Sequence, residues 1–151
     1  MTLKSFKENA IIRVTALHRS GGEEEKIEFV TVGAFFARGG KFYIFYEETE
    51  QIGMEDSTVM LICEKDKVTF KRSGSGRLKF TYVEGESENV LYYFPFGSVN
   101  MTQTTSKVRC GLDDAGGSVE LEYTLCMGKD KQENLLDIKV ERQKRRKDLR
   151  I

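Results

Sequence analysis

The sequence predicts a single all-β domain, an antiparallel meander barrel of about eight to ten strands. Apolar and polar residues alternate along most of the chain, as they do in strands that bury one face. Turn residues, glycine above all, interrupt this alternation at short intervals, which is typical of a β meander. The 151 residues, 39% of them hydrophobic, are enough for one buried core.

The first part of the chain is expected to form strands at residues 10–20, 26–38 and 41–48. In the first of them, Ile12 and Val14 share one face and Arg13 lies on the other. Gly39-Gly40 separates the second strand from the third. It predicts a two-residue hairpin loop, because glycine adopts the positive φ of a primed turn without strain.

Shorter strands are expected in the middle of the chain, at residues 58–64, 67–73 and 77–84. Lys65-Asp66 is predicted to form the tight turn between the first two. In the third, Leu78, Phe80 and Tyr82 alternate with polar residues. This alternation predicts one buried and one solvated face.

The remaining strands are expected at residues 90–97, 98–110, 118–127 and from about 134 to 142. The last of these is predicted to pair with the first strand and so to close the sheet, which removes exposed edges. Good helix formers follow Arg142, so a frayed or helical tail is expected at about 143–151.

The aromatic stretch VLYYFPFG, residues 90–97, has three possible roles: a stacking platform for bases, a ligand pocket or core. Its alternation places Tyr92, Phe94 and Phe96 on one face of a strand, where they are expected to fill the barrel. No basic residue lies in or shortly after the stretch, which argues against nucleic-acid binding. Tyr92 or Tyr93 is the expected place for a pocket.

Residues 29–36 are apolar on both faces of the expected strand. The two faces carry Phe29 with Phe35 and Val30 with Val32 and Phe36. Since a barrel needs only one apolar face, the outer face is expected to be covered. The cover is either the N-terminal segment around Leu3 and Phe6 or a second subunit in a homodimer.

A family resemblance is carried by the segments EFVTVGAFF, KFYIFYEETE, KVTFKRSG, YYFPFG and VELEYTL. From about Ile12 to Val140 the chain resembles the YwiB-like proteins of Gram-positive bacteria. The resemblance implies a lipocalin-like, calycin-type barrel with no assigned biochemical activity, and it offers no functional residue to transfer. The chain has no tryptophan, so the Gly-x-Trp element of true lipocalins is absent and their transport of secreted ligands is not carried over.

Composition restricts the partners and the compartment. The formal net charge is zero, so no global field attracts nucleic acid or a membrane, and either partner would need a local patch. Charged residues interrupt the N-terminal segment and no apolar window spans a bilayer, so a cytoplasmic location without membrane contact is expected. Cys63, Cys110 and Cys126 lack C-x-x-C spacing, which predicts reduced, buried thiols.

The basic C-terminus is a separate candidate. From Lys139 to Ile151 the chain has seven basic and two acidic residues, a net charge of +5. Such a tail binds nucleic acid or the acidic loops of a neighbouring copy, or it only solubilises the terminus.

Arg72 is the most informative inward-facing residue. It shares a face with Val68 and Phe70, and a buried guanidinium requires a carboxylate partner, for which Glu48 is the predicted choice. One interpretation is a polar-ligand anchor inside the barrel. The alternative is a structural ion pair, or an arginine at the rim that reaches water. The candidate ligand-binding residues are Tyr46, Glu48, Arg72, Tyr82, Tyr92 and Gln103.

No catalytic, metal or cofactor residue is assigned. The only histidine, His18, has no local nucleophile or acid beside it and is expected to be structural or exposed. The favoured function is therefore non-catalytic binding of a small apolar or amphipathic ligand inside the barrel. The alternative is a protein or nucleic-acid interaction module that uses the outer apolar face or the basic tail. Nucleic acid is the less favoured partner, and an enzyme ranks last.

Overall fold

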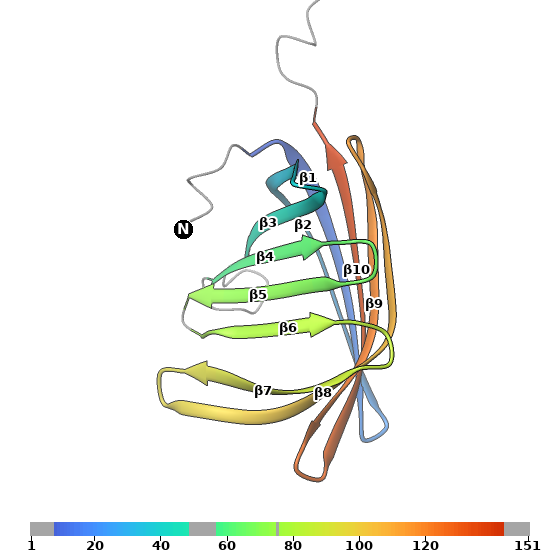
Figure 1. The fold of residues 1–151 in the computed structure, drawn as a ribbon. Coiled ribbons are helices and arrows are strands. Elements are labelled where there is room, and N and C mark those ends of the chain that lie inside the picture. The colour runs from blue at the N-terminus through green and yellow to red at the C-terminus, as the bar shows by residue number, and fades with distance from the viewer. Residues whose placement is uncertain (1–7, 49–56, 75, 144–151) are drawn as a thin grey trace, which may run out of the picture.

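The molecule is built from one antiparallel sheet that curls into a barrel (Figure 1). The computed structural model describes residues 8–48, 57–74 and 76–143, and these contain ten strands and no helix. In chain order the strands are β1 (Ala10–Ser20), β2 (Glu23–Arg38), β3 (Lys41–Glu48), β4 (Ser57–Cys63), β5 (Val68–Gly74), β6 (Leu78–Tyr82), β7 (Ser87–Phe94), β8 (Gly97–Asp113), β9 (Gly116–Met127) and β10 (Asp130–Arg142). The predicted all-β barrel is confirmed.

The strands follow the order β6-β5-β4-β3-β2-β1-β10-β9-β8-β7 across the sheet. The predicted pairing of the first and last strands is confirmed, with Val14 opposite Ile138. That pairing lies in the middle of the sheet, however, so the prediction that it closes the barrel is wrong. The free edges are β6 and β7, which a turn from Val83 to Glu86 brings together.

The seam, meaning the junction of β6 and β7, closes the barrel with little backbone pairing. At one end of it, Arg77 and Tyr93 exchange two backbone hydrogen bonds of 2.7 and 3.0 Å. Beyond this bridge the Thr81 N–H donates to the Glu88 carboxylate (2.7 Å), and the Gln103 amide donates to that carboxylate (2.8 Å) and to the Thr81 carbonyl (3.1 Å). Side chains therefore satisfy the backbone groups that a strand ladder would otherwise pair.

Two tight turns form where the sequence predicts them. Gly39 and Gly40 have φ values of 60° and 79°, as a two-residue primed hairpin requires. Lys65-Asp66 also lies in a turn, in which the Glu64 N–H donates to the Lys67 carbonyl. Both hairpin predictions are confirmed.

Gly33 marks the point where β2 changes partners. Ala10 of β1 pairs with Gly33, and the next residue, Ala34, pairs with Phe45 of β3. A Cβ on Gly33 would lie 2.1 Å from the Phe45 carbonyl oxygen and 2.5 Å from the Ile12 side chain. Only glycine permits this close approach of strands at the bend.

Replacing Gly33 by alanine is expected to lower the free energy of unfolding by about 1–3 kcal/mol, because the backbone must move to admit the methyl group. Guanidinium chloride denaturation measures the change. Gly111→Ala is the matched control, since its Cβ would lie 3.8 Å from the Ser118 carbonyl, an ordinary contact. Equal losses in both variants would contradict the steric explanation.

The core fills the barrel from the inside. Phe80, Tyr82 and Tyr123 form an aromatic cluster in which the Tyr82 and Tyr123 ring centroids are 4.8 Å apart. On the outside, a second apolar cluster consists of Ala34, Phe36, Tyr43, Phe45 and Met60. The prediction of two apolar faces is confirmed.

What covers the outer apolar face stays a prediction. Leu3 and Phe6 lie outside the described residues. Val30 and Val32 are 57% and 51% exposed within the described chain, so this part of β2 remains open to a second subunit.

The aromatic stretch turns the chain as predicted but fills less of the core. β7 ends at Phe94 and β8 begins at Gly97, so Pro95 and Phe96 form the loop. Phe94 is 37% exposed and Phe96 is 95% exposed, so the prediction that both rings fill the barrel is wrong. The strand alternation ends at the proline, and Phe96 projects from the tip of the hairpin.

Candidate functional site: the barrel cavity

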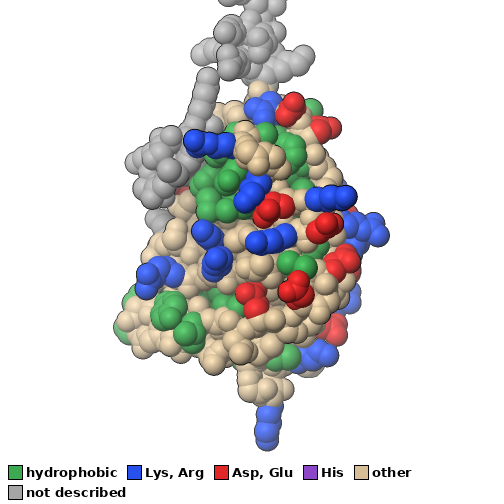
Figure 2. Space-filling model, in the orientation of Figure 1, with side chains coloured by type: hydrophobic (Ala, Val, Ile, Leu, Met, Phe, Trp, Pro, Cys, Tyr) green, Lys and Arg blue, Asp and Glu red, His purple; other side chains and the backbone are tan. Residues whose placement is uncertain are grey.

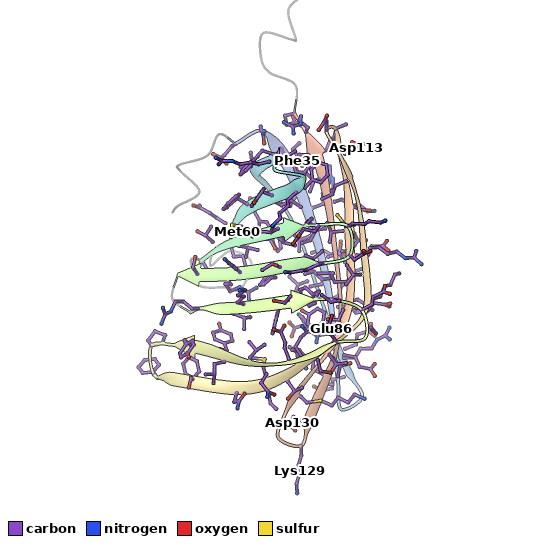
Figure 3. The ribbon with its side chains drawn as sticks, viewed as in Figure 1. Phe35, Met60, Glu86, Asp113, Lys129 and Asp130 are labelled. Atoms are coloured by element: carbon purple, nitrogen blue, oxygen red, sulfur yellow. The ribbon has the colours of Figure 1, made fainter. Side chains whose placement is uncertain are left out.

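The barrel contains an internal cavity of about 380 Å³. It lies toward the β1–β2 and β9–β10 hairpins, the end marked by Lys129 and Asp130 in Figure 3. Phe35 marks the opposite end, where it is fully buried and stacks on Phe42 with the ring centroids 5.7 Å apart. One end of the barrel is thus packed solid and the other is hollow.

The cavity wall is mainly apolar. It includes Ala16, Ile27, Phe29, Phe80, Leu125 and Leu136. The polar side chains on the wall are Tyr46, Glu48, Arg72, Tyr92, Tyr123, Gln132, Asn134 and His18. A ligand in this space would meet aliphatic and aromatic groups on most sides and a few polar groups at defined points.

Arg72 and Glu48 form the ion pair that the sequence predicts. Arg72 Nε donates to Glu48 Oε1 at 2.7 Å and Nη2 donates to Oε2 at 3.0 Å, while the Ser57 hydroxyl donates to Oε1 at 2.9 Å. The two charged side chains are only 18% and 6% exposed. Burial acts to lower the pKa of Arg72, but the hydrogen bond and the charge of Glu48 outweigh burial and raise it.

Two tyrosines of the cavity wall, Tyr46 and Tyr123, stay protonated. Burial, reinforced by the negative charge of Glu48, raises the pKa of Tyr46 well above its ordinary value. Burial likewise raises the pKa of Tyr123. These hydroxyls are therefore hydrogen-bonding groups and carry no charge near neutral pH.

The structure brings only part of the predicted site together. Tyr46, Glu48, Arg72 and Tyr92 line the cavity. Tyr82 does not: its ring lies behind the wall against Tyr123, and burial raises its pKa strongly. Gln103 belongs to the seam with Glu88. Strand parity predicted that Tyr82 and Gln103 point inward, and both do. Parity carries no information, however, on how far along the barrel a side chain lies.

Sequence reasoning missed the polar contact at the open end. His18 and Asn134 face each other on the paired strands β1 and β10, and the His18 ring Nδ1 hydrogen-bonds the Asn134 side-chain oxygen at 2.5 Å. The sequence predicts that the first and last strands pair, but it does not give their register, and therefore it does not place His18 opposite Asn134. In the observed register His18 lies at the cavity wall, and its hydrogen bond to Asn134 holds the ring in place.

A pair of thiols lies away from the cavity. Cys63 of β4 is buried, Cys110 of β8 is partly buried, and both are free, as is Cys126. A hydrogen bond between the two thiols raises the pKa of Cys63, where burial adds to the effect. The same hydrogen bond lowers the pKa of Cys110 to about 7.

Alkylation of Cys110 by iodoacetamide is therefore expected to rise as the pH rises through about 7, because the thiolate is the nucleophile. Mass spectrometry of each cysteine-containing peptide across a pH series measures the midpoint. Cys63→Ala removes the hydrogen bond and should move the midpoint upward. An unchanged midpoint in that variant would contradict the proposed cause.

Within the described part of the chain, no three His, Cys, Asp or Glu side chains come close enough together to hold a metal ion. No helix in the same residues is long and apolar enough to cross a membrane.

The family model for a domain of unknown function, DUF1934, matches residues 12–138. The chain belongs to the DUF1934 family. This DUF1934 chain is 28% identical over 124 residues to the "uncharacterized beta-barrel protein YwiB" of Bacillus subtilis (strain 168), covering 82% of this chain and 85% of that protein.

The fold of the DUF1934 chain also matches a solved structure. The crystal structure of the ywiB protein from Bacillus subtilis superposes with a TM-score of 0.82 at 22% identity, covering 91% of this chain and 93% of the other. The YwiB-like resemblance read from the sequence is confirmed, and so is the barrel.

Proposed function

We propose that the barrel binds a small, neutral, apolar or amphipathic molecule in its internal cavity. The observation that carries this proposal is the cavity of about 380 Å³ with a mainly apolar wall. Its size falls in the range of small-molecule sites, which are typically about 300–1,000 Å³. A barrel of this kind can equally be filled by its own side chains, and the packed end around Phe35 has that character whereas the cavity end does not.

The preference for a neutral ligand follows from the ion pair on the wall. Both nitrogens of Arg72 that point to Glu48 are engaged, and the carboxylate also accepts the Ser57 hydroxyl. Glu48 already balances the charge of Arg72, and no second Lys or Arg of the described residues lines the cavity, so a carboxylate or phosphate ligand would add an unbalanced negative charge beside Glu48, which is costly. Hydroxyl, ether or carbonyl groups can instead bond to Tyr46, Tyr92 or Gln132 at the wall.

We assign the barrel to the lipocalin-like, calycin-type architecture on the same basis. An antiparallel meander around one ligand-sized cavity is the arrangement in which such barrels hold small molecules. The cytoplasmic location and the homodimer remain predictions of the sequence.

Fluorescence of N-phenyl-1-naphthylamine, a neutral apolar probe, tests the proposal. Wild-type protein is expected to enhance the fluorescence saturably, and Ala16→Phe, which fills the cavity, to abolish the enhancement. Ala37→Phe is the matched control, since Ala37 is exposed and lies outside the cavity lining. Equal binding by wild type and Ala16→Phe would overturn the internal site. If the probe binds as expected, native mass spectrometry of the protein as purified identifies any bound natural ligand.

The alternative role in protein contacts depends on other surfaces. Residues 144–151 of the basic tail lie outside the described residues. The outer apolar face on β2, with exposed Val30 and Val32, supports a second copy as partner. Size-exclusion chromatography with light scattering of wild type and Val32→Lys tests it, and a monomer in both would contradict it.

A further inference from the structure

A second hollow lies on the outer surface of the barrel, over β4 to β7. It is a groove of about 730 Å³, and we propose that it binds single-stranded nucleic acid. Its apolar lining includes Met60, Leu78 and Leu91. Its cations are Arg72, which is paired with Glu48, and Lys71, Arg77 and Lys79. Figure 2 shows Lys and Arg side chains beside hydrophobic ones on the left of the view, whereas Asp and Glu side chains lie in the middle and on the right, mixed with further Lys and Arg. Lys71, Arg77, Lys79 and Tyr93 line the groove but not the internal cavity, so each proposal is tested with its own variants.

The positive charge of the groove is concentrated on two neighbouring strands. Lys71 of β5 and Lys79 of β6 lie directly opposite each other in the strand register, and like charges in this position are destabilising. None of the described carboxylates lines the groove or forms a salt bridge with Lys71, Arg77 or Lys79. A phosphate bound between the two ammonium groups relieves their repulsion, so the groove is complementary to a polyanion.

The groove also offers a stacking surface. The Tyr93 side chain is 45% exposed, and the Arg77 guanidinium lies over its ring at 5.4 Å from the centroid. Exposed Leu91 lies two residues earlier on the same face of β7. Bases stack on aromatic rings and on guanidinium planes, while lysines along the groove hold the phosphates.

The groove is assembled from several strands, which is why the sequence pattern around Tyr93 alone did not favour nucleic acid as a partner. The stretch around Tyr93 contains no basic residue, but Lys71 lies on β5, Lys79 lies on β6, and Arg77, just before β6, forms a bridge to Tyr93. The interleaving of basic and aromatic groups that such sites require is thus built across strands.

Two other polyanionic partners fit less well. An acidic peptide satisfies the lysines but makes no use of the exposed ring beside Arg77. An anionic membrane requires apolar groups that project in one plane, whereas Met60 and Leu78 lie on the floor of a hollow. A single strand uses both the charges and the stacking surface.

Fluorescence anisotropy with labelled single-stranded RNA of mixed sequence, over a salt series, tests the proposal on the full chain. The triple variant Lys71→Gln/Arg77→Gln/Lys79→Gln is expected to bind roughly 10-fold or more weakly. It should also lower the slope of log affinity against log salt by about 2, since each lost contact removes about 0.7. Tyr93→Leu should weaken binding roughly 5- to 100-fold, whereas Tyr93→Phe should keep it.

Two controls distinguish binding in the groove from binding that depends on net charge or on the basic C-terminal tail. Lys65→Gln/Lys67→Gln/Lys129→Gln makes the same charge change at exposed lysines outside the groove lining and should bind like the wild type. Binding that survives the groove variant but is lost on deletion of residues 144–151 would overturn the proposal. So would equal binding to polyglutamate or to phosphatidylserine vesicles through the same lysines. A far-UV circular dichroism spectrum and a urea denaturation midpoint like those of the wild type show that the groove variant is folded.

Discussion

Replacing Arg72 by methionine is expected to lower the free energy of unfolding by about 3–5 kcal/mol. The Glu48 carboxylate, 6% exposed, would lose both hydrogen bonds from the guanidinium and keep only the Ser57 hydroxyl. A buried charge that loses its partner lowers the stability of the folded state. Urea denaturation followed by far-UV circular dichroism measures the loss.

A double variant distinguishes loss of the pair from loss of packing. Arg72→Met/Glu48→Met removes both charges and is expected to return to within about 1 kcal/mol of the wild type. Arg19→Met is the matched surface control, because Arg19 pairs with Glu24 at 54% exposure on both sides and such pairs contribute about 0–1 kcal/mol. A double variant as unstable as Arg72→Met would mean that the charge of Glu48 is not the cause.

Replacing Gln103 by methionine is the second large effect, expected at about 3–5 kcal/mol. Gln103 is fully buried and serves three groups: its amide donates to the Thr81 carbonyl and to Glu88, and its oxygen accepts the Thr105 hydroxyl at 2.7 Å. Methionine has a similar shape but leaves all three groups short of a partner. Chemical denaturation gives the total effect.

Hydrogen exchange locates the effect of Gln103→Met in the barrel. Because Gln103 joins β8 to β6 across the seam, the amides of β6 are expected to exchange faster in the variant than those of β1 and β10. Thr104→Val is the control, since its hydroxyl makes an exposed bond to Ser87 and should change stability by no more than about 0.5 kcal/mol. Uniform acceleration in all strands would contradict a local role at the seam.

The internal cavity and the outer groove share part of one wall. Arg72 and Leu78, on β5 and β6, line both hollows. A change of either residue is therefore expected to affect both surfaces, which is why the tests of the two proposals use Ala16 for the cavity and Lys71, Arg77 and Lys79 for the groove.

Much of the barrel could be predicted from local patterns. The alternation in 41–48 placed Ile44, Tyr46 and Glu48 on the buried face, and all three are buried. Parity also identified Arg72 as an inward charge that needs a carboxylate, and the bidentate pair with Glu48 follows. These predictions succeeded because the direction of a side chain in a strand depends on its position alone.

Other features depend on distant parts of the chain. Phe96 continues the alternation of Tyr92 and Phe94 in sequence, but it is 95% exposed because it lies in the hairpin loop beyond the end of β7. Tyr82 and Gln103 point inward as predicted but lie away from the cavity wall, since depth is set by the register between strands. Glu88 was not singled out, although it holds the seam through Thr81 and Gln103.

Local sequence patterns were enough to predict the strands, their turns and the inward or outward direction of most side chains, because period-2 alternation and the positive φ of glycine are local properties. The place where the sheet closes, the end of the barrel that is hollow and the cations beside Tyr93 could be learned from the three-dimensional arrangement alone. These depend on strand order and register, which bring together residues far apart in the chain.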